Sequence, residues 1–197
     1  PGQRRFAIWT LSLYMALLGI GFMCIEIPVI QRFILILGTP VLAFTVVVGT
    51  LLIGAGLGSM LSARLFMRRA FPAPLAVAIV ALAVPAIVAG VQPSLLSLGS
   101  GAAIIASIAL LVPLGVVLGM PFPIGLRLAA EALPGDVALF WSLNALFSVL
   151  GSVGAAVVAV RAGFSTVLLC GVLCYLGAAI VLLYHDRAPS TVSVARH

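Results

Sequence analysis

Residues 41–66 read VLAFTVVVGTLLIGAGLGSMLSARLF and carry a single charged side chain, Arg64, close to their end. A helix of about 20 apolar residues crosses a hydrocarbon core about 30 Å thick, and this run is long enough to do so. Its apolar residues do not alternate with polar ones, as they would in a strand of a transmembrane barrel. The stretch therefore predicts a transmembrane helix.

Five further apolar runs of similar length extend this pattern along the chain. The six expected spans cover residues 6–30, 41–66, 74–91, 101–120, 139–160 and 163–184. A turn-prone stretch, FILILGTP, follows the first span and ends at Pro40, and residues 188–197 form a polar tail. We expect one all-α, polytopic integral membrane domain over residues 1–187.

The composition supports a membrane class, because 64% of the residues are hydrophobic and only 7% are charged. Soluble domains have about 25% charged residues, so lipid must cover the remaining apolar surface. The net charge of +6 comes from arginines scattered between apolar runs. A nucleic-acid-binding protein would gather them on one basic face. We therefore expect the lipid bilayer as a partner, and we do not expect nucleic-acid binding.

The arginines are divided unevenly between the two ends of the expected spans. Arg32 and Arg161 fall at one end, and the other eight fall at the end that holds the N-terminus: Arg4, Arg5, Arg64, Arg68, Arg69, Arg127, Arg187 and Arg196. Arginine-rich loops stay on the cytoplasmic side of a membrane. We expect both termini in the cytoplasm.

Small residues and prolines mark two places where the expected helices have special geometry. Gly54 and Gly58 form a GxxxG motif, which lets two membrane helices pack closely. Pro121 and Pro123 lie in GMPFPIG and predict a break at the end of the fourth span. Two interpretations of this break stay open: a helix end at the interface, or an unwound segment that lines a cavity.

Glu26 is the one acidic residue expected within a span, in FMCIEIPVI. A carboxylate at the centre of a membrane helix costs about 2.5–3.5 kcal/mol on insertion scales. It is therefore either a cation or proton site, or an interfacial residue paired with an arginine of a neighbouring loop.

A polar stripe runs along the fifth span. Trp141, Asn144, Ser148 and Ser152 recur every three or four residues and so share one helix face. Such side chains either hold helices together, as we expect for Ser152, or line a substrate path. No nucleophile–base pair, metal-ligand spacing or dinucleotide fingerprint occurs in the sequence, so we expect no catalytic residue, no metal and no cofactor.

Three stretches together resemble the C-terminal membrane region of bacterial spermidine-synthase-like fusion proteins. They are LLGIGFMCIEIPVIQRFILILGTPVLAFTVVVGTLLIGAGLGSMLSARL, GMPFPIGLRL and FWSLNALFSVLGSVGAAVVAVRAGF, and the similarity covers about residues 11–184. The resemblance implies a bacterial inner-membrane location and a fold similar to half of a major-facilitator transporter. It also implies an aminopropyltransferase-like catalytic domain in a longer parent chain, which fits a sequence that begins with Pro1.

One position departs from the transporter pattern. Transporters of that type carry a glycine–aspartate–basic motif after the second span, and Gly58 and Arg64 match it here together with Arg68 and Arg69. Ser62 stands where the aspartate belongs.

We therefore expect a non-catalytic membrane domain that serves as an anchor, scaffold or accessory subunit for a fused or partner protein. The alternative is a transporter-like domain that binds or moves a small cation such as a polyamine. In that case Glu26 would supply the anion, and Asn144 and Ser148 would supply hydrogen bonds.

Overall fold

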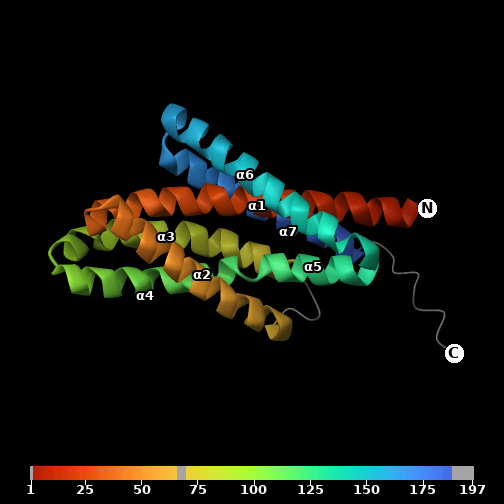
Figure 1. Cartoon of the computed structure of the whole chain (residues 1–197), viewed down its shortest axis with the longest axis horizontal. Coiled ribbons are helices and arrows are strands. Elements are labelled where there is room, and N and C mark those ends of the chain that lie inside the picture. The colour runs from red at the N-terminus through yellow and green to blue at the C-terminus, as the bar shows by residue number, and fades with distance from the viewer. Residues whose placement is uncertain (1, 66–69, 188–197) are drawn as a thin grey trace.

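The computed structural model describes residues 2–65 and 70–187, and within these ranges all regular structure is helical (Figure 1). The elements are α1 (Gly2–Leu37), α2 (Pro40–Leu65), α3 (Pro72–Leu96), α4 (Ser100–Leu118), α5 (Pro121–Ala132), the short 3-10 helix η1 (Pro134–Asp136), α6 (Val137–Ala162) and α7 (Phe164–Arg187). Six segments of the described chain are long and apolar enough to cross a membrane, with α4 and α5 together forming one of them. The prediction of an all-helical, six-span membrane protein is confirmed.

The first helix is longer than the sequence predicted. α1 continues past the expected end of the first span at residue 30, through residues 31–37, although residues 33–40 were expected to form a turn-prone stretch. Pro28 lies inside the helix, and residues 29–37 beyond it contain no proline or glycine. Gly38 adopts a positive φ of 79°, and α2 begins two residues later at Pro40. The turn is therefore confined to Gly38 and Thr39.

The fourth span is a broken helix. α4 ends at Leu118, Gly119 and Met120 form a turn, and α5 begins at Pro121. Proline suits the first turn of a helix, because its fixed φ is helical and its missing N–H would have no partner there. α5 has no counterpart among the six expected spans, and in Figure 1 it extends onward from the end of α4.

α1 is the central helix of the bundle, with α6, α7 and α2 packed against it, while α3 packs against α4 and α7. The largest fully buried side chains include Tyr14, Phe33, Phe140 and Tyr175. α6 is the least buried of the candidate spans, and Figure 1 shows it crossing the outside of the bundle. Its exposed valines must therefore face lipid or another protein.

The closest helix contact joins α2 to α4. A Cβ atom built at Gly54 would lie 2.9 Å from the backbone of Gly115, and one at Gly58 would clash with the carbonyl of Val116. A Cβ at Gly119 would clash with Ala55 in the same way. Gly115 and Gly119 form a second GxxxG motif, GVVLG, so two such motifs face each other across this interface.

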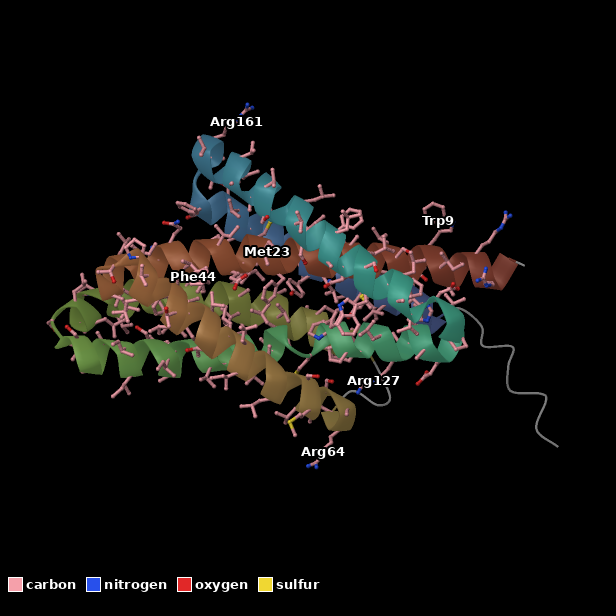
Figure 2. The ribbon with its side chains drawn as sticks, in the orientation of Figure 1. Trp9, Met23, Phe44, Arg64, Arg127 and Arg161 are labelled. Atoms are coloured by element: carbon pink, nitrogen blue, oxygen red, sulfur yellow. The ribbon has the colours of Figure 1, made fainter. Side chains whose placement is uncertain are left out.

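α1 begins and α7 ends at the same end of the bundle. The Arg4 guanidinium lies 2.8 Å from the Asp136 carboxylate, and the Thr10 hydroxyl lies 3.4 Å from Nδ1 of His185. Figure 2 shows Arg64 at the end of α2, on the lower side of the view, and Arg161 at the end of α6, on the upper side. Arg68, Arg69 and Arg196, like the expected polar tail 188–197, lie outside the described residues.

Candidate functional site

A cavity of about 500 Å³ lies in the middle of the bundle, at the break between α4 and α5. α1, α2, α6 and α7 supply the rest of its wall. The lining residues are Leu18, Phe22, Met23, Leu52, Ala55, Ser59, Leu118, Gly119, Pro121, Phe122, Pro123, Leu126, Asn144, Ser148 and Tyr175. The wall is therefore mostly apolar, with a few hydroxyl and amide groups.

Neighbouring helices hold the broken segment in place. The buried Tyr14 hydroxyl of α1 donates a 2.8 Å hydrogen bond to the carbonyl of Pro121. Gly125 makes room for this tyrosine, because a Cβ there would meet its ring. Phe122 packs edge-on against Trp141 of α6, with ring centroids 5.9 Å apart and an interplanar angle of 84°. The break is thus a built feature of the bundle and not a frayed helix end.

Asn144 and Ser148 lie on the cavity wall, but their donors are used within the protein. The Asn144 amide donates to the carbonyl of Met15 at 3.1 Å, and the Ser148 hydroxyl donates to the carbonyl of Asn144 at 2.9 Å. α1 can approach this closely because Gly19 faces the backbone of Asn144 and Ser148. The Asn144 amide therefore helps to join α6 to α1, while the Ser148 hydroxyl bonds within α6.

Glu26 does not line this cavity. Met23, one helical turn earlier on α1, is the residue that does. The Glu26 side chain is half-buried, and within residues 2–65 and 70–187 it makes no ion pair or hydrogen bond. The structure thus brings Asn144 and Ser148 together and places the expected carboxylate outside their cavity.

Ser152 bonds to its own helix, since its hydroxyl donates to the carbonyl of Val149 at 2.8 Å. The neighbouring Gly151 makes the contact with α1, because a Cβ there would lie 2.8 Å from Cα of Ile20. The sequence analysis did not single out Gly151 for this contact. Among the described residues, no three histidine, cysteine or acidic side chains come together in a group that could hold a metal.

Ser62, at the position where transporters have an aspartate, is fully buried. Its hydroxyl donates to the carbonyl of Ser59, and its own carbonyl accepts a 3.2 Å hydrogen bond from the Arg127 guanidinium. Arg127 thus fastens α5 to the last turns of α2. This hydrogen bond joins residues 65 positions apart, and no local sequence pattern predicts it.

Protein-family models, curated proteins and solved structures were each searched, and none matches the chain.

Proposed function

We propose that the chain is a membrane-embedded anchor or scaffold that holds a fused or partner protein at the arginine-rich end of the bundle. The observation that carries the proposal is the chemistry of the central cavity. Its lining residues are uncharged, and the amide and hydroxyl donors of Asn144 and Ser148 are engaged within the bundle. Side chains used in this way stabilise helix packing and leave little with which to select a solute.

The exposed face of α6 supports the same proposal. Val149, Val153 and Val160 are each more than half exposed on this helix. Contiguous apolar surface of this kind suits contact with another membrane helix as well as with lipid. We place the partner's membrane segment, or a second half of the parent chain, against this face. We also place the arginine-rich end in the cytoplasm of a bacterial inner membrane.

The experiment is purification of the natural protein from its own membrane under mild detergent, followed by measurement of intact mass and stoichiometry. A scaffold is expected either as a chain far heavier than 20.2 kDa or in a complex of one defined composition. The double substitution Val149→Trp and Val153→Trp should release the partner. The matched substitution Ile53→Trp and Met60→Trp, at equally exposed positions on α2, should not. A chain of 20.2 kDa that purifies alone contradicts the proposal.

A second candidate function is solute binding in the central cavity, as in a transporter. It is favoured by the unwound turn at Gly119 and Met120, because transporters place binding sites at discontinuous helices. In the described chain, the side-chain oxygen of Asn144 accepts no hydrogen bond and can receive one from an amine. A polyamine is the cationic ligand that the sequence first suggested.

Uptake of radiolabelled polyamine into liposomes that contain the purified chain tests this second function. Asn144→Ala should lower uptake and Ser142→Ala, whose hydroxyl bonds only within α6, should not. Glu26→Gln is a separate arm, and unchanged uptake there would remove Glu26 from the mechanism. Liposomes with wild-type protein that take up no more than empty ones would exclude polyamine transport.

A further inference from the structure

A second cavity, of about 300 Å³, lies at the end of the bundle opposite the arginine-rich end. α1, α3 and α7 form its wall, and its lining residues are Pro28, Val29, Gln31, Arg32, Phe33, Leu35, Val84, Pro85, Val88, Phe164, Ser165 and Leu168. All but Gln31, Arg32 and Ser165 are apolar. The cavity thus combines a cation with an extended hydrophobic wall.

Arg32 lies half-buried in this wall and has no hydrogen-bond or ion-pair partner among the described residues. Its Nε atom is buried and has no hydrogen-bond acceptor in the part of the chain that the structure describes. Within the same residues, Arg32 makes no ion pair. Buried polar groups are almost always hydrogen-bonded, and an arginine within a membrane protein normally pairs with an anion or a carbonyl. The buried, unpaired Nε–H of this half-buried arginine therefore points to an acceptor supplied from outside the chain.

The start of α7 adds positive potential to the same cavity. Phe164 and Ser165, the first two residues of this 24-residue helix, both line it. The first backbone N–H groups of a helix have no intrahelical acceptor, and they carry the positive end of the helix dipole. A guanidinium and a helix N-terminus at one cavity form a setting suited to phosphate.

The remaining wall suits a hydrocarbon chain. Leu35 and Phe164 are exposed in this lining and Pro85 and Leu168 are partly exposed, while Val29, Phe33, Val84 and Val88 are buried in the wall. A free inorganic anion would gain nothing from such walls. A molecule with a phosphate at one end and an acyl chain at the other would use the cation and the apolar surface together.

We infer that this cavity binds one anionic phospholipid of the bilayer, in the leaflet opposite the arginine-rich end. The Arg32 guanidinium donates to the phosphate oxygens, and the first turn of α7 contributes its partial positive charge. An acyl chain lies along the accessible apolar side chains of Leu35, Phe164 and Leu168. This inference does not depend on the scaffold proposal, since either a scaffold or a transporter could carry the lipid.

The test is lipid retention by the purified full chain. The protein is reconstituted in phosphatidylcholine nanodiscs with and without phosphatidylglycerol, extracted gently and examined by native mass spectrometry. Wild-type protein should retain phosphatidylglycerol in preference to phosphatidylcholine. Arg32→Gln should lower retention of phosphatidylglycerol by about tenfold, the effect of losing one charge-assisted contact.

Arg161→Gln is the matched control, because it removes the same charge at the same end of the bundle. Figure 2 shows Arg161 directed away from the bundle, so retention should change by less than about twofold. Arg32→Lys should give an intermediate loss, since lysine keeps the charge without the planar fork. Leu168→Trp fills the cavity and should reduce retention with Arg32 still in place, which separates lipid loss from loss of the cation.

Three results would overturn the inference. They are full retention of phosphatidylglycerol by Arg32→Gln, equal losses in Arg32→Gln and Arg161→Gln, and displacement of the lipid by inorganic phosphate. The last outcome would assign the cavity to a soluble anion. The elution volume of each variant on size exclusion confirms that it is folded before its lipid is counted.

Discussion

At the scale of single residues, Gly58 makes the tightest of the glycine contacts between α2 and α4. Gly58→Ala should destabilise the bundle by about 1–3 kcal/mol, because the added methyl group would overlap the backbone carbonyl of Val116. Gly56 lies on the same helix with nothing near its Cβ position, so Gly56→Ala should cost little. Thermal unfolding in one detergent compares the two variants, and equal midpoints would show that the contact is not tight.

Asn144 supports a second prediction at this scale. Asn144→Ala removes the hydrogen bond to the Met15 carbonyl and should cost about 0.6 kcal/mol, the average for hydrogen bonds between membrane helices, and at most about 1.7 kcal/mol. Ser142→Ala on the same helix loses only a bond to Ala138 and should be near neutral. Unfolding with increasing denaturing detergent measures both. If Asn144→Ala left the stability unchanged, the Asn144 hydrogen bond would not contribute to helix packing.

The residues of the central cavity were visible in the sequence one at a time, but their arrangement was not. Helical spacing places Asn144 and Ser148 on one face of α6, and both do line one cavity. Spacing says nothing about how α1 is rotated against α6. The sequence could not show whether Glu26 faces Asn144 and Ser148. In the structure Met23, and not Glu26, lies on the cavity wall. The Arg32 cavity depends on three helices and was not foreseen.

At the scale of elements, the hydrogen bond from Tyr14 is one of the contacts that hold the broken span in place. Tyr14→Phe keeps the packing of the ring against Gly125 but removes the donor to the Pro121 carbonyl. Hydrogen exchange over residues 119–125 should then speed up severalfold, because a buried hydrogen bond of this kind contributes about 1 kcal/mol. Tyr184→Phe, at an exposed hydroxyl, is the control. An unchanged exchange rate in Tyr14→Phe would show that the turn is stable without the Tyr14 hydrogen bond.

The elements were predictable where the signal was local. Five of the six apolar spans and the break at GMPFPIG could be located from the sequence, because hydropathy and proline determine the structure of the residues next to them. The first span was located too, except for its end. The extension of α1 was missed because Gly38 and Pro40 indicated a turn over the whole stretch that ends with them. Only Gly38 and Thr39 are outside a helix. α5 was missed because it is too short to span a membrane, and because the bond from Arg127 to Ser62 joins residues far apart in the sequence.

At the scale of the whole molecule, the arginine distribution predicts the orientation. Single cysteines can be introduced in a background in which Cys24, Cys170 and Cys174 are replaced by serine. In intact bacterial cells, Thr39→Cys and Ser97→Cys, in turns at the arginine-poor end, should react with a membrane-impermeant maleimide. Gly135→Cys, next to the Arg4–Asp136 pair, should react only after the membrane is opened. The reverse pattern would invert the topology.

The length of α1 has a consequence for the molecule as a whole. Its 36 residues rise about 54 Å at 1.5 Å per residue, against a hydrocarbon core about 30 Å thick. Tilting takes up part of this excess, and the rest must stand clear of the acyl chains. A thicker bilayer covers more of α1, and a thinner bilayer leaves more of α1 outside the acyl chains. The height of its N-terminal turns above the surface therefore follows the thickness of the membrane around it.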